Sequence, residues 1–87
     1  MIYTVKISKQ FKKDFAKLDA ITQSRVLLVL ESMRGKPLEN SKKLINVKVG
    51  IYRRRIGDFR LRYDIIKKEH VLILYRIRHR KEVYKED

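Results

Sequence analysis

Apolar and polar residues follow regular spacings along the first third of the chain, and these spacings predict a strand followed by a helix. Residues 2–7 alternate between apolar and polar side chains, as a half-buried strand does. Ser8 is placed to cap the start of a helix. Beyond it, apolar residues recur at i, i+4 and i+7 on one side of an amphipathic helix that we expect to end near Asp19, namely Phe11, Phe15 and Leu18.

A second helix is predicted to start close to Thr22. Its apolar stripe has the spacing i, i+3, i+4, i+7 and consists of Val26, Val29, Leu30 and Met33, with Leu27 widening it. Gly35 followed by Pro37 predicts a sharp stop. The two helices would form a helical hairpin.

The remainder of the chain has the alternation typical of strands. Residues 51–56 and 59–66 flank the turn dipeptide Gly57-Asp58, which predicts a β-hairpin. Residues 71–77 are apolar at nearly every position, as in an inner strand covered on both faces. Residues 36–43 are polar and predict a surface connection. Residues 44–49 fit either a short edge strand or an extended arm.

This order of elements predicts an α+β fold in a single domain over residues 1–87. An N-terminal strand and a helical hairpin precede a three- to four-stranded antiparallel sheet, and both helices should pack on one face of that sheet. Tyr52 and Tyr63, on neighbouring strands, are expected to pack in or beside the core.

Composition adds a strong charge to this picture. The chain has 23 Lys and Arg against 10 Asp and Glu, a net charge of +13, and no cysteine. Disulfides, thiolate nucleophiles and cysteine zinc sites are therefore excluded, which suits a reducing cytoplasm. No apolar stretch approaches the roughly 18 residues of a membrane span, so we expect no membrane partner. A charge of this size favours a polyanionic partner, either nucleic acid or an acidic protein.

The charge is concentrated in two short segments. Residues 53–62 contain five arginines and one aspartate, and residues 76–81 contain three arginines and a lysine, so each segment has a net charge of +4. Side chains alternate across a strand, so Arg53 and Arg55 should share one face with Arg60 and Arg62 of the partner strand, pointing away from the helices. Arg76 and Arg78 could join them. Lysines of the first helix are instead expected to form a solvated face.

Residues 50–63, Gly-Ile-Tyr-Arg-Arg-Arg-Ile-Gly-Asp-Phe-Arg-Leu-Arg-Tyr, together with residues 77–84, Ile-Arg-His-Arg-Lys-Glu-Val-Tyr, resemble the RelE/ParE toxin superfamily and its RelE branch most closely. The resemblance covers the whole domain and implies a RelE-like fold. It further implies the toxin of a type II toxin–antitoxin pair that enters the ribosome and cuts messenger RNA. Such toxins cleave by attack of a ribose 2′-hydroxyl on the adjacent phosphate and need neither metal nor cofactor.

The resemblance also implies roles for individual residues. Arg53 and Arg55 match basic positions of the family's second strand, and Arg60 matches the arginine after the Gly-Asp turn, which would hold the phosphate. The catalytic arginine near the carboxyl terminus matches either Arg80 or Arg78. Tyr84 matches the terminal tyrosine, which either takes the proton or orients the ribose. Arg62 and Lys81 are expected to contribute to RNA-phosphate binding.

Bacterial RelE toxins often have lysines where this chain has Arg53 and Arg55. Arginine does not give up its proton near neutral pH, so these two side chains can stabilise charge but cannot act as a general base. Proton transfer would then fall to Tyr84, His79 or Glu82. Alternatively, His79 ends a strand and hydrogen-bonds a backbone group, and Tyr84 anchors the tail.

Two other functions are compatible with the sequence. A ParE-like protein would inhibit DNA gyrase through protein contacts without catalysis, and a simple RNA-binding module would bind RNA without cutting it. In the toxin interpretation the implied partners are an acidic RelB-like antitoxin, the ribosome and messenger RNA.

Overall fold

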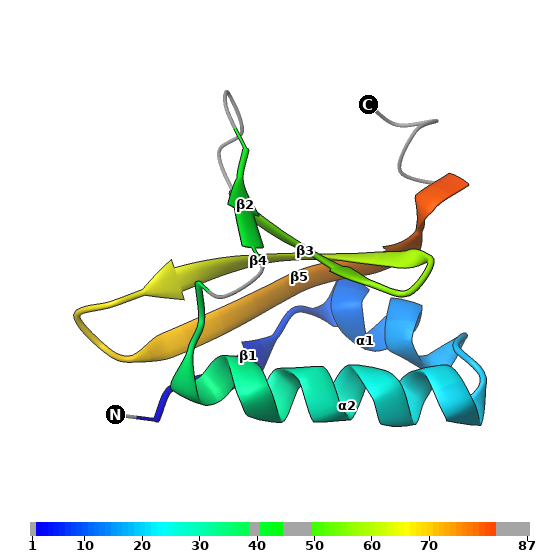
Figure 1. The fold of residues 1–87 in the computed structure, drawn as a ribbon, viewed down its shortest axis with the longest axis horizontal. Helices are drawn as coiled ribbons and strands as arrows, with labels where there is room; N and C mark the ends of the chain where they lie inside the picture. Colours follow the sequence, from blue (N-terminus) through cyan, green and yellow to red (C-terminus); the bar gives the residue numbers. More distant parts are fainter. Residues whose placement is uncertain (1, 39–40, 45–49, 82–87) are drawn as a thin grey trace.

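The computed structural model describes residues 2–38, 41–44 and 50–81. Their order is a strand, two helices and four further strands (Figure 1). The elements are β1 (Thr4–Ile7), α1 (Lys9–Ala16), α2 (Ala20–Gly35), β2 (Ser41–Lys43), β3 (Tyr52–Ile56), β4 (Phe59–Ile66) and β5 (Val71–His79). The predicted α+β class is confirmed.

The strands form one five-stranded sheet in the order β1-β5-β4-β3-β2, and both helices lie beneath it in Figure 1. Strands β2 to β5 pair antiparallel in succession, whereas β1 pairs parallel with β5. The long connection that parallel neighbours require contains the helical hairpin and strands β2, β3 and β4. Predicting both helices on one face was correct. Neither described helix is long and apolar enough to cross a bilayer.

Local capping explains where the helices begin and end. The Ser8 hydroxyl accepts the Phe11 N–H at 3.0 Å and caps α1, as predicted. Asp19 does not end α1, which already stops at Ala16; its carboxylate accepts the Thr22 N–H at 2.7 Å and caps α2. Hydrogen bonds from the side chain and the backbone N–H of Thr22 lower the pKa of Asp19. Consequently α2 begins at Ala20, two residues before the predicted start.

The edge strand differs from its prediction. Residues 41–43, expected to belong to a surface connection, form β2 and pair with β3. An edge strand needs only backbone partners, and lysines are common there because they discourage further pairing, so the polar sequence gave no strand signal. Of the segment predicted as an edge strand or arm, residues 45–49 lie outside the described residues.

The core lies between the helices and the lower face of the sheet. Its largest fully buried side chains are Tyr63, Met33, Leu61, Leu72, Leu74, Ile77 and Val26. Tyr63 belongs to this core as predicted, and Tyr52 stacks against it with ring centroids 5.8 Å apart. Leu27 was expected to widen the apolar stripe of α2, but it is 54% exposed because it lies at the margin of that stripe, where it lines an open hollow with Thr4 and Val5 of β1.

A one-residue bulge in β5 changes which side chains face the helices. Tyr63 lies opposite Leu74, but the next pair is Arg62 with Arg76, so Tyr75 is an extra residue. Strand β5 lies inside the sheet as predicted, between β1 and β4. It is not covered on both faces, since Ile73 and Tyr75 are only half-buried.

Candidate functional site

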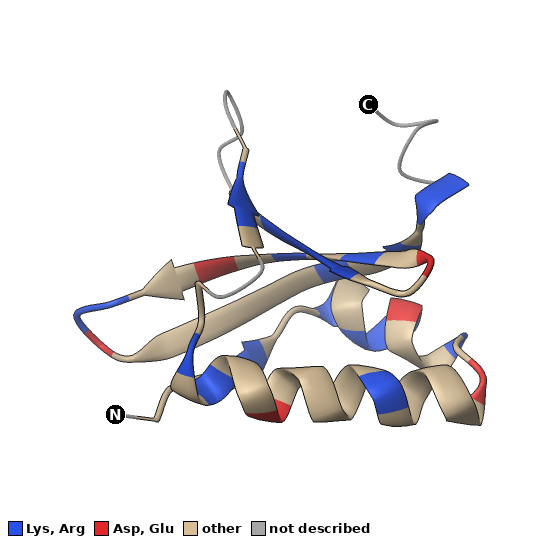
Figure 2. Cartoon of the chain, in the orientation of Figure 1, with Lys and Arg blue, Asp and Glu red and all other residues tan. Residues whose placement is uncertain are grey.

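Six arginines form two rows across strands β3, β4 and β5 on the sheet face away from the helices. Residues directly opposite each other on paired strands share a face. The turn row, next to the Gly57-Asp58 turn, consists of Arg55, Arg60 and Arg78. The middle row lies two residues further from the turn on each strand. It consists of Arg53, Arg62 and Arg76. Figure 2 shows the basic residues of β2, β3 and the end of β5.

Four of the basic side chains enclose a hollow of about 210 Å³ on this open face. We call it the cationic hollow, and its lining residues are Lys42, Arg53, Arg55 and Arg60. Neighbouring strands are about 4.8 Å apart, so these cations lie well within the range of strong mutual repulsion. Arg55 also donates through Nε to the Gly57 carbonyl at 3.2 Å, which orients its guanidinium beside the turn.

Two arginines of the middle row are held by contacts within the chain. Arg62 donates through Nε to the Gly50 carbonyl at 3.1 Å. Arg76 forms a salt bridge with Asp14 of α1, with Nε 2.8 Å from Oδ2. The expectation that Arg76 joins the phosphate-binding surface is therefore not supported, because its charge is already neutralised.

The remaining arginine of β3 faces the other way. Arg54 lies opposite Leu61 and is only 9% exposed, on the helix side of the sheet. It therefore adds nothing to the open face, and the +4 charge of residues 53–62 is divided between the two faces. Alternation along the strand predicts this division.

An acid and a tyrosine occupy the open face beyond the middle row. Asp64 accepts the Ile51 N–H at 2.8 Å and so fixes the chain entering β3. Burial and the adjacent Asp64 carboxylate raise the pKa of the Tyr75 hydroxyl, which therefore stays protonated near neutral pH. A side chain at Gly50 would meet Tyr75 and Arg62, and Gly50 has a φ of +63°, which explains why glycine occupies this position.

The carboxyl end of β5 contributes residues to both sides of the sheet. Arg78 lies opposite Arg60 on the open face. His79 lies opposite Phe59 on the helix side, with their rings edge to face and centroids 5.4 Å apart. The Nδ1 atom of His79 accepts the Lys81 N–H at 3.2 Å. His79 thus bonds a backbone group at the strand end, the alternative stated above, and does not reach the cationic hollow.

Arg80 and Lys81 are exposed beyond the end of β5. The Arg80 N–H donates to the Asp58 carbonyl at 2.8 Å, so the chain is tied to the β3–β4 turn at this point. Tyr84 and Glu82, the other proposed proton-transfer residues, lie outside the described residues.

Lys42 is the one member of the cationic hollow that the sequence analysis did not assign. It lies on β2 opposite Arg53, and its placement depends on that strand being recognised. The adjacent pair Lys42-Lys43, in the segment predicted as a surface connection, was the available signal.

The arrangement can bind anionic groups and stabilise developing negative charge. Arginine offers a planar set of donors that matches phosphate oxygens. Within residues 2–38, 41–44 and 50–81, no cluster of three His, Cys, Asp or Glu side chains is placed to hold a metal ion.

Comparison with known families decides what this surface belongs to. A family profile described as "ParE toxin of type II toxin-antitoxin system, parDE" matches residues 5–84. The chain belongs to this toxin family, within the RelE/ParE superfamily. The resemblance seen in the sequence is thereby confirmed, and the protein is the toxin of a type II toxin–antitoxin system.

Relatives of this toxin extend over nearly its whole length. A curated protein of Methanocaldococcus jannaschii, provisionally named a RelE toxin, is 27% identical over 98% of both chains. The RelE–RelB complex of Pyrococcus horikoshii contains a similar chain, with a TM-score of 0.79, 28% identity and coverage of 92% of this toxin and 97% of that chain. The RelBE2 toxin–antitoxin complex of Mycobacterium tuberculosis contains another, with a TM-score of 0.82, 25% identity and coverage of 91% and 99%.

Proposed function

We propose that this toxin is a ribosome-dependent endoribonuclease that cuts messenger RNA without a metal ion. The observation that carries the proposal is the cationic hollow, in which Lys42, Arg53, Arg55 and Arg60 converge on an open sheet face. Its relatives' names as RelE toxins support the same function. Because its proposed targets are ribosomes and messenger RNA, we expect the toxin to act in the cytoplasm.

In the proposed reaction, a ribose 2′-hydroxyl attacks the adjacent phosphorus and the bond to the 5′-oxygen of the next nucleotide breaks. The products are a 2′,3′-cyclic phosphate and a 5′-hydroxyl. Negative charge accumulates on the phosphate oxygens in the transition state, where preorganised cations are most effective. Arg60 holds this phosphate, with Arg55 beside it and Arg78 opposite it in the turn row. Arg53, Arg62 and Lys81 contact neighbouring phosphates, and Arg80 is an alternative to Arg78.

Proton transfer requires a group other than the arginines. His79 is turned toward the helix side of the sheet, away from Arg60. We therefore assign removal of the 2′-hydroxyl proton to Tyr84, with Glu82 as the alternative, and the departing 5′-oxygen takes its proton from water. Replacing Tyr84 by phenylalanine tests this assignment, since it should lower the cleavage rate while leaving RNA affinity unchanged.

The function is tested by incubating the purified toxin with ribosomes carrying a defined message and mapping the ends of the products. We expect 2′,3′-cyclic phosphate and 5′-hydroxyl ends. The substitution Arg60→Ala should lower the rate about 100- to 1,000-fold, the usual effect of removing one preorganised transition-state donor. Lys68→Ala, in the exposed β4–β5 turn, is the matched control and should leave the rate unchanged. Intact message, or equal rates for both variants, would contradict the proposal.

An acidic antitoxin is the partner that we infer. Similar chains occur in the RelE–RelB complexes of Pyrococcus horikoshii and Methanococcus jannaschii. A net charge of +13 favours an acidic partner, and two leucines of α2, Leu27 and Leu28, are 54% and 73% exposed. A disordered acidic segment that folds into an amphipathic helix could cover both kinds of surface.

Inhibition of DNA gyrase is the second candidate, because the matching family profile is that of the ParE toxins. Such a toxin would act through protein contacts and need no converging cations. A supercoiling assay distinguishes the two functions: inhibition of gyrase by both the unmodified toxin and the Arg60→Ala variant, with uncut message, would favour this alternative.

A further inference from the structure

We propose that Ser8 and Asp14 are positioning residues that hold the outer half of β5, and with it Arg78, in place for the reaction proposed above. The inference rests on that function for its catalytic consequence. It concerns the segment of β5 from the bulge at Tyr75 to Ile77, which immediately precedes Arg78.

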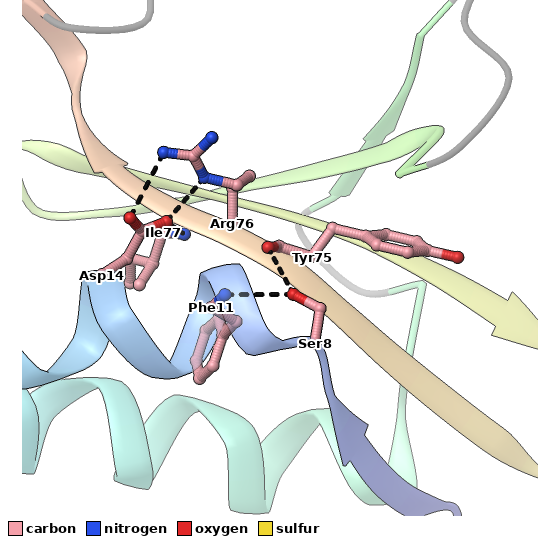
Figure 3. Close-up of polar contacts among 6 residues, drawn as sticks. All are labelled: Ser8, Phe11, Asp14, Tyr75, Arg76 and Ile77. Atoms are coloured by element: carbon pink, nitrogen blue, oxygen red, sulfur yellow. Dashed lines mark hydrogen bonds and ion pairs between the residues drawn. The ribbon is translucent and has the colours of Figure 1, made fainter.

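This segment has a strand neighbour on one side only. Strand β1 pairs with β5 as far as Leu74 and then ends at Ile7, and the chain turns into α1. The Ser8 N–H donates to the Leu74 carbonyl at 3.0 Å, and the Ser8 hydroxyl donates to the Tyr75 carbonyl at 2.8 Å. Where β1 ends, the start of helix α1 therefore replaces it as the hydrogen-bonding neighbour of β5 (Figure 3).

Asp14 makes the second attachment, one helical turn and a half further along α1. Its Oδ2 accepts the Ile77 N–H at 3.2 Å and the Arg76 Nε–H at 2.8 Å, while Oδ1 accepts from Arg76 Nη2 at 3.3 Å. The residue is only 7% exposed. A buried carboxylate is tolerated only when charged and hydrogen-bonding partners compensate its desolvation, and three donors do so here.

The bulge determines which face Arg78 occupies. If Tyr75 paired with Arg62 and the regular register continued without a bulge, Arg78 would lie opposite Phe59, on the helix side. With the bulge, Ile77 enters the core opposite Leu61 and Arg78 lies opposite Arg60. Burial of Ile77 fixes the face, and pairing with β4 together with the hydrogen bond from the Arg80 N–H to the Asp58 carbonyl sets the register of the strand end. Ser8 and Asp14 hold the opposite edge of this segment, which has no strand neighbour.

A misplacement of about 1 Å in a catalytic group can lower a rate up to about 100-fold without weakening binding. Loss of either attachment should therefore reduce the single-turnover cleavage rate on programmed ribosomes about 10- to 100-fold. Affinity for RNA should not fall, because the residues of the cationic hollow are untouched. In Asp14→Ala it should even rise slightly, since Arg76 loses its neutralising partner.

The experiment compares Ser8→Ala with Asp19→Ala, which removes the corresponding N-cap acceptor, the partner of the Thr22 N–H, from α2. Asp14→Asn, which retains one acceptor oxygen, is compared with Asp14→Ala. For each variant we would measure thermal stability, the cleavage rate, affinity for a 2′-O-methyl RNA of the message sequence, and amide hydrogen exchange at Ile77 and Arg78.

The proposal is supported if Ser8→Ala and Asp14→Ala lower the cleavage rate and speed amide exchange at residues 77–78 while RNA affinity is retained. The control Asp19→Ala should lose stability but keep the cleavage rate of the unmodified toxin. Asp14→Asn should lie between the unmodified toxin and Asp14→Ala. Full cleavage by Ser8→Ala and Asp14→Asn, or an equal loss in Asp19→Ala, would overturn it. If the unmodified toxin cuts no message, the proposed function fails, whereas unchanged exchange at residues 77–78 in both α1 variants would refute the positioning role itself.

Discussion

Three of the four cations in the cationic hollow are arginines and not lysines. This residue type excludes general acid–base catalysis at those three positions. The three are Arg53, Arg55 and Arg60, and arginine side chains in general are not deprotonated in proteins. They can bind and stabilise a phosphodiester but cannot exchange a proton with it. A lysine at the same position would be surrounded by like charges, which lower its pKa.

Replacing Arg55 by lysine should therefore make RNA affinity more dependent on pH than it is in the unmodified toxin, whose hollow contains the single lysine Lys42. Near pH 7 the lysine is charged and affinity for a 2′-O-methyl RNA should fall only a few-fold, through loss of the two-pronged contact. As the pH rises toward 9.5 the lysine loses its proton, so the affinity ratio between the toxin and Arg55→Lys should widen. Fluorescence anisotropy from pH 6.5 to 9.5 measures it. A ratio that stays constant would show that residue 55 does not contact the phosphate.

Tyr63 gives a prediction about stability at alkaline pH. Burial raises the pKa of its hydroxyl above the ordinary value of 10.0, and the hydroxyl donates to the Pro37 carbonyl at 2.6 Å. Because the folded-state pKa is the higher one, this contribution is complete below pH 10 and is lost as the pH rises toward the folded-state value. Tyr63→Phe should thus lower the free energy of unfolding by about 1 kcal/mol at pH 7.

Urea denaturation of both proteins at several pH values checks the prediction about Tyr63. The difference in unfolding free energy should be constant up to about pH 10 and shrink above it. Titration of lysines affects both proteins equally and cancels in the difference. A difference that grows above pH 10 would contradict the prediction.

At the scale of single residues, the sequence predicted which face of the sheet a side chain occupies better than it predicted which groups that side chain contacts. Alternation along β3 and β4 correctly placed Arg53, Arg55, Arg60 and Arg62 on one face. It could not show that Arg62 bonds to the Gly50 carbonyl, because that contact joins segments that only folding brings together. The catalytic roles of these arginines stay predictions.

Among the elements, the β3–β4 hairpin carries most of the cationic hollow, and its turn depends on one glycine. Gly57 has a φ of +59°, which L-residues adopt only at a cost. A Cβ there would lie 2.9 Å from Nη1 of Arg25, the mobile end of a long side chain, so backbone strain dominates. Gly57→Ala should destabilise the fold by about 1 to 2 kcal/mol.

Gly35 provides the matched control for this turn. It ends α2, has no atom within 4 Å of an added Cβ, and does not have a positive φ. Gly35→Ala should be neutral or stabilise by up to about 1 kcal/mol. Chemical denaturation of both variants separates the effects, and equal stabilities would show that the turn imposes no strain.

Elements were predictable where local spacing and burial agree. The hairpin of β3 and β4 follows from alternation and a turn dipeptide, and α2 follows from its helical stripe. Strand β2 was not predicted, because its three polar residues pair only through the backbone and leave no apolar alternation. The bulge was missed as well, although a signal exists: inward apolar residues fall at Leu72 and Leu74 but then at Ile77, which breaks the period of two.

Over the whole molecule, basic residues outnumber acidic ones, but basic side chains converge on one hollow. The formal charge of +13 includes lysines of α1 and arginines of α2, whereas the cationic hollow gathers four cations on one face. If the hollow is the nucleic-acid site, RNA binding should depend on those few contacts. If the excess charge binds RNA diffusely, the response to salt should reflect far more phosphates.

The salt dependence of RNA affinity distinguishes these cases. For single strands, the logarithm of affinity falls with the logarithm of salt concentration with a slope of about −0.7 per phosphate contact, so one contact for each of the four cations of the hollow contributes roughly −3. Lys42→Ala should make the slope less steep by about 0.7, because it removes one contact. Lys68→Ala, in the turn at the other end of β4, should leave it unchanged. Anisotropy titrations of a 2′-O-methyl RNA at 50 to 300 mM salt would measure the slopes, and an equal change for both lysines would assign binding to the overall charge and not to the hollow.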